Sequence, residues 1–272
     1  MSFNTTITEK KYKKLILQVN LNGFSYCIAD TLNNKIDFVN TIDFANYPKS
    51  NKVEDHFWKA FLDNRDLVKT YDEVLVLHDN NWNSFVPQAL FNEELLSSYL
   101  QFNTKVFETD FFTFDSLSNQ EINNVYVPFS NINNYLLDQF ESFNYHHVNT
   151  ILVAKLLEIS KNNEEKQVFV HFSTSKFEIV VVQNQKLLFF NSFDFQTKED
   201  FIYYLLFTAE QLNLNPEHFK LQLLGEIDQE SAFFEIAYKY IRNVSLLDVY
   251  ELQQNLGFST AQILKHFILF QS

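Results

Sequence analysis

Two stretches of this chain, Leu15–Phe44 (LILQVNLNGFSYCIADTLNNKIDFVNTIDF) and Gln167–Phe195 (QVFVHFSTSKFEIVVVQNQKLLFFNSFDF), follow one pattern. Each contains a strand, a short polar turn, a second strand, a turn with Asn and Lys, and a third strand. The third strands match best, Phe38–Phe44 (FVNTIDF) against Phe189–Phe195 (FFNSFDF). Their alternation and their β-branched and aromatic residues predict strands. This internal repeat predicts two halves of similar architecture.

The segments that follow each repeat also correspond. Val53–Leu67 has helical spacing, with Phe57, Phe61 and Leu62 on one predicted face. Lys198–Leu212 is its counterpart, with Thr197 as the predicted N-cap. The first half continues with predicted strands Glu73–His78 and Asn124–Phe129 and predicted helices Glu93–Phe102 and Asn133–Phe143. The second half continues with predicted strands Lys220–Ile227 and Val244–Tyr250 and predicted helices Gln229–Arg242 and Thr260–Phe270.

The predicted order is therefore βββαβαβα in each half. A meander of three strands followed by alternating helices and strands predicts an α/β fold, a mixed sheet with helices on its faces. This is the ribonuclease H-like topology, and two tandem copies are the plan of the actin-like ATPase fold. We expect residues 1–145 to form the first half and residues 146–272 the second. The second half would begin with a linking helix, His146–Asn162, and the first would carry added material at Asn80–Leu90 and Asn103–Gln120, including one or two extra strands.

The composition and the net charge of the chain argue against several kinds of partner and location. The net charge of −13 argues against nucleic acid or an anionic membrane as the main partner, because both need a basic surface. Cys27 is the single cysteine, which excludes an internal disulfide, and its apolar neighbours predict a buried thiol. No run of 18 apolar residues exists and the N-terminus lacks an apolar signal core. We therefore expect no membrane span and a cytoplasmic location.

Several segments carry a resemblance to a known family. They are NSFDFQTKEDFIYYLLFTAEQL (191–212), LLGEI (223–227), YKYIRNV (238–244), ILQVNLNGFSYCIAD (16–30) and FVPQALF (85–91). In these the chain resembles a set of uncharacterised proteins from Bacteroidetes-type bacteria, grouped as a domain of unknown function. The resemblance covers nearly the whole chain and implies an actin-like ATPase fold, with no implied activity. By fold alone, the chain is also similar to actin-like scaffold proteins of pilus and secretion machines.

The scarcity of glycine bears on nucleotide chemistry. The chain has three glycines, Gly23, Gly225 and Gly257, where about 19 are expected. A phosphate site needs glycine because the backbone must approach the anion closely. The likeness to the actin-like superfamily implies ATP held between the halves, by a turn with Asp and Gly in each half and a glycine-rich adenosine turn. Few positions in this chain can supply such turns.

The corresponding turns are incomplete. The first, Asn20–Gly23 (NLNG), keeps a glycine but lacks the acid that would hold hydrated Mg²⁺. The second, Ser173–Lys176 (STSK), has neither residue, although its hydroxyls and Lys176 could meet a phosphate. Gly225 stands where the adenosine turn would start, but Glu226 follows it. The candidate nucleotide contacts are Asn20, Asn22, Gly23, Ser173, Thr174, Ser175 and Gly225. The simpler interpretation of Gly23 and Gly225 is a turn and a strand end with positive φ.

Other chemistries find less support. A ribonuclease H-like nuclease needs several carboxylates on its first strand, but Gln18, Asn20, His171 and Ser173 occupy those positions in the two halves. His146 and His147 would point about 100° apart on a helix and cannot chelate together, so we expect a helix-start or interface pair. His78 closes a strand without a nearby nucleophile, and we interpret Asp30 as a turn residue. We predict no catalytic residue, no metal site and no cofactor.

Aromatic residues in the added material allow two interpretations. Phe111, Phe112 and Phe114 lie among Asp110 and Asp115 and predict either a partner surface or a small local core. The stripe in the last predicted helix, expected to pack on the second sheet, consists of Ile263, Leu264, Phe267, Ile268 and Phe270.

Three functional hypotheses remain. The first is a non-catalytic interaction or scaffold protein with a protein partner and a degenerate nucleotide cleft. The second is a sensor that binds a nucleotide or another small molecule without hydrolysis, because the polar turns near Asn20 and Ser173 should face each other in an actin-like fold. The third is an enzyme of an unrecognised kind.

Overall fold

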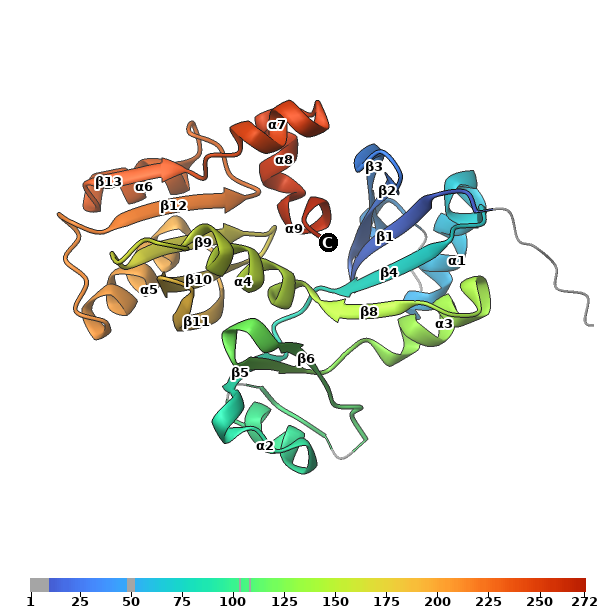
Figure 1. Cartoon of the computed structure of the whole chain (residues 1–272), viewed down its shortest axis with the longest axis horizontal. Helices are drawn as coiled ribbons and strands as arrows, with labels where there is room; N and C mark the ends of the chain where they lie inside the picture. The colour runs from blue at the N-terminus through green and yellow to red at the C-terminus, as the bar shows by residue number, and fades with distance from the viewer. Residues whose placement is uncertain (1–9, 48–51, 103, 108) are drawn as a thin grey trace, which may run out of the picture. The chain divides into compact units, whose positions relative to one another are not determined.

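The structure of the chain is a computed structural model that describes residues 10–47, 52–102, 104–107 and 109–272. These residues divide into two compact units (Figure 1). Unit 1 comprises the described parts of Met1–Asp79 and Pro128–His146, and unit 2 those of Asn80–Val127 and His147–Ser272. The predicted halves at 1–145 and 146–272 stay a prediction, and the first residues of that range and Glu108 of the added material lie outside the described part of the chain.

Unit 1 is built on a five-stranded sheet in the order β3-β2-β1-β4-β8. The β1–β2 and β2–β3 pairs are antiparallel and β1 lies parallel to β4, which is the pattern that the first repeat predicted. The strands are β1 (Lys13–Asn20), β2 (Gly23–Asp30), β3 (Lys35–Asp43), β4 (Glu73–His78) and β8 (Asn144–His147).

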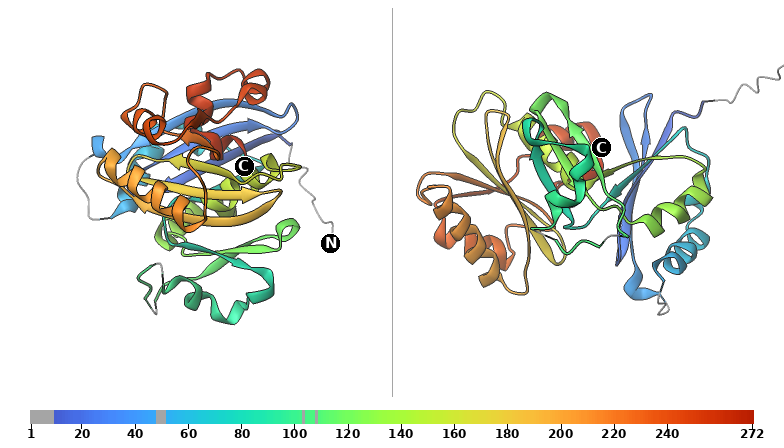
Figure 2. Two further views of the ribbon diagram at one scale, coloured as in Figure 1. Left: turned by 90° about the vertical axis from the view of Figure 1, so that its left-hand side faces the viewer. Right: turned by 90° about the horizontal axis from the view of Figure 1, so that it is seen from below.

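Helices α1 (Val53–Asp63) and α3 (Ser130–Phe140) contact one another beside the sheet of unit 1 (Figure 2). Phe57 and Phe61 of α1 are buried, and the ring of Phe57 stacks on Phe24 of β2 at 4.9 Å between centroids. The prediction was wrong for Leu62, which is 60% exposed. Helix α1 is shorter than predicted and is followed by a short 3₁₀ helix, Arg65–Val68.

Unit 2 repeats this sheet in the order β11-β10-β9-β12-β13. Its strands are β9 (Gln167–Phe172), β10 (Lys176–Gln183), β11 (Lys186–Asp194), β12 (Lys220–Gly225) and β13 (Asn243–Leu246). Every residue of β9 is buried, because helices cover both faces of the central strands. These helices are α4 (Val148–Ile159), α5 (Lys198–Gln211), α6 (Ala232–Tyr240), α7 (Tyr250–Leu256), α8 (Thr260–Lys265) and α9 (Phe267–Phe270).

The helix starts and ends of unit 2 follow local chemistry. The Thr197 hydroxyl accepts the Asp200 N–H and so caps α5. The Asp200 carboxylate in turn accepts the Thr197 N–H, which confirms the predicted cap. Gly257 ends α7 in the left-handed region at φ +74°. The predicted last helix is divided at His266 into α8 and α9, and Ile263, Leu264, Phe267 and Ile268 are buried as expected.

The added material forms a subdomain with its own three-stranded sheet, in the order β5-β7-β6. Its elements are β5 (Asn83–Pro87), α2 (Leu96–Leu100), β6 (Thr113–Leu117) and β7 (Ile122–Tyr126). A small core of Val86, Leu100, Val125 and Val127 holds it together. We call this subdomain the insert; by its contacts it belongs to unit 2.

The insert corrects two sequence predictions. Asn124–Phe129 is not the fifth strand of the first sheet, because its residues pair within the insert as β7; the fifth strand is β8, four largely polar residues. The segment Glu93–Phe102, predicted as one helix, contains a 3₁₀ turn and the five-residue α2. Helix α3, predicted to follow the fifth strand, precedes it, so outside the insert unit 1 has the order βββαβαβ, and the next helix, α4, belongs to unit 2. Within the described residues, no helix combines the length and the apolar character that crossing a membrane requires.

Candidate functional site

The first candidate turn, between β1 and β2, is held by hydrogen bonds within the chain. The Asn22 N–H donates to Asn20 Oδ1 at 2.8 Å, and the Asn22 carbonyl accepts the Phe44 N–H at 2.9 Å. A Cβ on Gly23 would lie 2.2 Å from the carbonyl oxygen of Ile42 on β3. The predicted positive φ at Gly23 was therefore wrong: the close approach of a neighbouring strand requires glycine here, and no ligand is needed to explain it.

The structure places an acid beside this turn that sequence reasoning passed over. Asp79 follows β4, and its N–H donates to the Val19 carbonyl at 2.9 Å. The Gln18 side-chain amide donates to Asp79 Oδ2 at 3.0 Å. Asp79 thus lies at the carboxyl end of two parallel strands, the edge where ligands of α/β sheets usually bind. Its position directly after a buried strand was the signal available in the sequence.

The second candidate turn, Ser173–Lys176, lies next to Gly225, the end of β12. Gly225 pairs with Phe172, the last residue of β9, at the carboxyl ends of two parallel strands. The Thr174 hydroxyl donates to the Glu226 carboxylate at 3.0 Å. The structure therefore brings Thr174 and Gly225 to the same strand ends, and the Thr174 hydroxyl is bonded to a carboxylate.

Gly225 has a structural role that fits the simpler interpretation. Its φ is +91°, and a Cβ there would lie 2.1 Å from the carbonyl oxygen of Phe172. The next residue, Glu226, donates its N–H to the same carbonyl at 2.8 Å. Both the backbone conformation and the lack of space require glycine at this strand end.

Lys176, the one cation of the second turn, is held by a buried acid. Its Nζ lies 2.6 Å from Glu178 Oε1, and His171 Nδ1 lies 2.9 Å from Glu178 Oε2. The Glu178 side chain is 1% exposed. Burial on its own raises the pKa of this carboxyl, but the Lys176 ammonium and the His171 hydrogen bond outweigh it and lower the pKa to about 2. Glu178 is therefore ionised at neutral pH and neutralises Lys176.

Glu226 carries a second ion pair at the same edge. Lys265 Nζ lies 3.3 Å from Glu226 Oε1, with both side chains part-exposed. The candidate turn thus has two carboxylates, from Glu178 and Glu226, beside its one lysine. Within the described part of the chain, no group of three or more His, Cys, Asp or Glu side chains is arranged to hold a metal ion.

Cys27 and Asp30 both have structural roles. Cys27 is buried, and that burial raises the pKa of its thiol to about 12. Asp30 accepts the N–H groups of Leu32 and Asn33, as expected of a turn residue, and the Asn33 bond together with Lys13 lowers its pKa. Each of these two predictions is confirmed.

The histidine pair lies at a strand-to-helix junction. His146 and His147 end β8, so the predicted helix begins two residues later, at Val148. The Asn149 N–H donates to His147 Nδ1 at 3.1 Å, which makes His147 the N-cap of α4 and confirms the helix-start interpretation for it. His78 Nδ1 accepts the Phe129 N–H at 3.2 Å inside unit 1.

The aromatic residues of the insert divide between the two interpretations. Phe112 and Phe114 pack against the insert core, whereas Phe111 is 55% exposed. Asp115 is buried and accepts the His147 N–H at 2.9 Å and the Thr150 hydroxyl at 2.6 Å. This buried acid fixes the insert to the start of α4.

The two repeated sheets and their helices define the class of this protein, an actin-like ATPase fold. The family model described as "Protein of unknown function (DUF3822)" matches residues 2–244, and the chain belongs to this family. A comparison with proteins of curated function finds no match.

Two solved structures, a Bacteroides thetaiotaomicron protein and a PilM–PilN complex, support the same fold. A Bacteroides thetaiotaomicron protein with an actin-like ATPase fold and unknown function is similar at 20% identity and a TM-score of 0.79, over 93% of this chain and 99% of that one. A PilM–PilN type IV pilus biogenesis complex matches at 11% identity and a TM-score of 0.54, over 94% and 96%. The cytoplasmic domain of EpsL, an inner membrane component of the Vibrio cholerae type II secretion system, matches at 12% identity and a TM-score of 0.49, over 87% and 86%.

Proposed function

We propose that this chain is a non-catalytic interaction or scaffold protein whose nucleotide-binding turns have degenerated. The observation that carries the proposal is the Lys176–Glu178 contact of 2.6 Å at the turn where the fold would meet a phosphate. The only cation of that turn is already neutralised by a buried carboxylate. The Thr174 hydroxyl in the same turn donates to a second carboxylate, Glu226.

Electrostatics explain why this arrangement disfavours phosphate. An anion at the Ser173–Lys176 turn would approach Glu178 and Glu226, and like charges at a few ångströms repel. To recruit Lys176 it would have to leave Glu178 buried without its ammonium partner, which is strongly unfavourable. In unit 1, the Asn20–Gly23 turn has no carboxylate of its own for hydrated Mg²⁺, and the neighbouring Asp79 already accepts the Gln18 side-chain amide at 3.0 Å.

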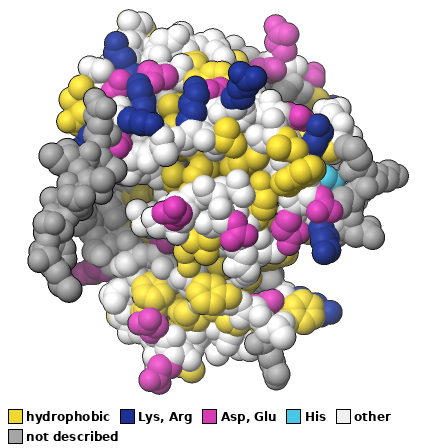
Figure 3. Space-filling view, turned by 90° about the vertical axis from the view of Figure 1, so that its right-hand side faces the viewer, with side chains coloured by type: hydrophobic (Ala, Val, Ile, Leu, Met, Phe, Trp, Pro, Cys, Tyr) yellow, Lys and Arg dark blue, Asp and Glu magenta, His cyan; other side chains and the backbone are white. Residues whose placement is uncertain are grey.

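A protein partner fits the remaining features better than nucleic acid does. On the face shown in Figure 3, acidic side chains lie among the basic ones, and the chain carries a net charge of −13. A continuous basic surface is what nucleic acid needs. The PilM structure of similar fold was solved in complex with PilN, which supports protein binding as a use of this architecture.

The test is ATP turnover together with nucleotide binding. We expect no phosphate release above a buffer control, with or without Mg²⁺, and no thermal stabilisation by millimolar ATP, ADP or GTP. A ligand present at 100 times its Kd would add about 2.7 kcal/mol of stability, which a thermal shift detects readily. Hydrolysis that is abolished by T174A, with S272A as the matched control far along the chain, would overturn the proposal.

A sensor that binds a small molecule without hydrolysis is the second candidate. It is favoured by the exposed position of Asn22, Thr174 and Ser175 at the two candidate turns. In unit 1 the contacts would come from Asn20, Asn22 and Gly23, and in unit 2 from Ser173, Thr174, Ser175 and Gly225. Stabilisation by a nucleotide without turnover, lost in N22A or S175A, would favour the sensor over the scaffold.

A further inference from the structure

Strand β11 is an edge strand without a charged residue between its ends. In the sheet of unit 2 it pairs only with β10. Its nine residues carry charge only at the two ends, Lys186 and Asp194. Exposed edges normally carry charged residues or are very short, because their unpaired backbone groups otherwise recruit another strand. The matching edge of unit 1, β3, has Asp37 within the strand, paired with Lys13 at 2.6 Å.

The hydrogen-bond pattern shows which groups of β11 point away from its sheet. The Phe195 N–H donates to the Ser175 carbonyl, which makes these two residues a hydrogen-bonded pair. Because such pairs alternate along an antiparallel ladder, Phe193 and Asn191 also form hydrogen bonds with β10. Residues between them, Phe190 and Ser192, therefore direct their N–H and C=O groups outward. The Ser192 N–H is taken by its neighbour, because Asn191 Oδ1 accepts it at 3.0 Å.

The same reasoning applies to β5, the edge of the insert sheet. The Val127 N–H donates to the Trp82 carbonyl and the Gln88 N–H to the Glu121 carbonyl, which fixes the inward pairs with β7. Asn83, Phe85 and Pro87 are therefore the residues whose backbone points outward. Pro87 has no N–H and is tolerated at such a position.

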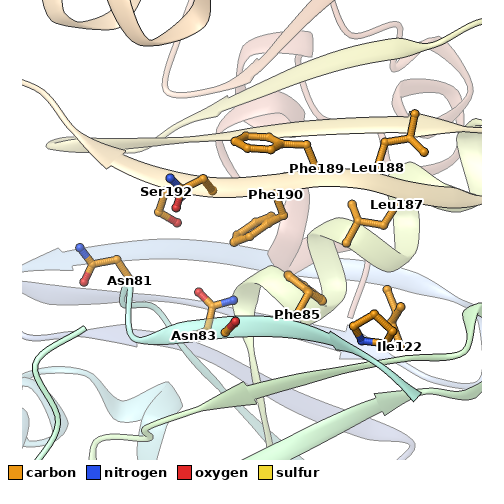
Figure 4. A pocket seen from close by; sticks show the side chains of 12 residues that line it. Asn81, Asn83, Phe85, Ile122, Leu187, Leu188, Phe189, Phe190 and Ser192 are labelled. Carbon is orange, nitrogen blue, oxygen red and sulfur yellow. The ribbon is translucent and has the colours of Figure 1, made fainter. Parts of the chain in front are cut away.

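These two outward edges line one hollow within unit 2 (Figure 4). Its volume is about 260 Å³. Phe85 of β5 and Phe190 of β11 meet edge to face at 4.8 Å between ring centroids, and Leu187 lies beside them. None of the 12 residues that line the hollow is charged, in a chain with a net charge of −13.

We propose that this hollow binds an extended, uncharged segment of a partner protein, which adds as a strand to the edge of β11 with β5 as the opposite wall. The outward N–H and C=O of Phe190 and the C=O of Ser192 would supply main-chain hydrogen bonds. Phe85, Phe190 and Leu187 would contact apolar side chains of the segment, and an uncharged lining excludes buried charges. This inference specifies the kind of protein segment that the proposed scaffold protein would bind, and it rests on that proposed function.

The probe is an acetylated and amidated heptapeptide of sequence TVTFTVT, with the same peptide methylated at its backbone amides as its control. Amide hydrogen exchange of the full chain, resolved by NMR, reports the binding. When nine molecules in ten carry the peptide, the Phe190 amide should exchange about tenfold more slowly, because it is accessible only in the remaining tenth. The methylated peptide, which cannot donate, should leave that rate unchanged.

Two matched variants test the place of binding. Leu188 lines the hollow and is 40% exposed, whereas Leu90 is 70% exposed outside it. L188K should remove the protection at Phe190, because a lysine guards the edge, and L90K should keep it. Unchanged exchange at Phe190 with millimolar peptide, equal protection by the methylated peptide, or full protection in L188K would each overturn the proposal. None of these readouts involves nucleotide, so ATP turnover would refute the proposed function separately.

Discussion

Replacing Glu178 by glutamine tests the electrostatic account of unit 2. E178Q keeps the size of the side chain but removes the charge that neutralises Lys176, whose side chain is only 12% exposed. The lysine would keep its burial and lose its carboxylate partner. Breaking a buried ion pair in this way is strongly destabilising.

The expected magnitude follows from the pKa. A fall in the pKa of Glu178 from 4.5 to about 2 corresponds to about 3 kcal/mol of stabilisation, since one pKa unit is about 1.4 kcal/mol. We therefore expect E178Q to lower the free energy of unfolding at pH 7 by about 3 kcal/mol. Urea denaturation followed by circular dichroism measures this as a lower midpoint with an unchanged slope.

The pH dependence has a definite sign. Because the folded-state pKa is lower than the unfolded value, the carboxylate stabilises the fold fully above pH 4.5. That contribution is lost as the pH falls from about 4.5 towards about 2. The difference between wild type and E178Q should shrink over this range.

Two comparisons make the prediction specific. E226Q removes a part-exposed ion pair with Lys265 and should cost less than about 1 kcal/mol. The double variant K176M/E178Q removes both buried charges and should recover part of the loss. The reasoning would be refuted if E178Q and E226Q destabilised the protein equally, or if the E178Q effect were the same at pH 3 as at pH 7.

Three further predictions concern single residues. G225A should lower stability by more than about 2 kcal/mol, because its Cβ would meet the Phe172 carbonyl at 2.1 Å, whereas G257A, with open space, should cost about 1 kcal/mol; urea midpoints compare them. Cys27 should not react with a thiol reagent at pH 8 until urea unfolds the chain, and rapid labelling of the native protein would contradict its burial. T197A should cost about 1 kcal/mol through loss of the α5 cap while T197S costs less, and equal losses would argue against the capping hydrogen bond.

The sequence predicts strands well but not their partners. Alternation in the two repeats was enough for the three-strand meanders, because those partners are neighbours in the chain. Asn124–Phe129 has equally strong strand character, yet it pairs inside the insert. The actual fifth strand, Asn144–His147, is short and polar and becomes a strand only because β4 lies beside it. Sheet membership of this kind is decided by tertiary contacts.

The candidate site shows the same limit. The Ser173–Lys176 turn on its own predicts a lysine that is available to a phosphate. Lys176 and Glu178 are two residues apart on one strand and so share a face, a signal present in the sequence. The third member, His171, enters only through the register between β9 and β10, which places it opposite Glu178.

The chain passes from β4 of unit 1 into the insert and returns from it to α3 of unit 1. The Asn80 side-chain amide donates to the Val127 carbonyl at 3.0 Å, and the Val127 N–H donates to the Trp82 carbonyl at 3.1 Å. Its two ends are thus neighbours, so a short glycine linker could replace everything between them without stretching the chain. The chain connection between β4 and α3 therefore does not depend on what the insert contains, whereas its contacts with the start of α4 do.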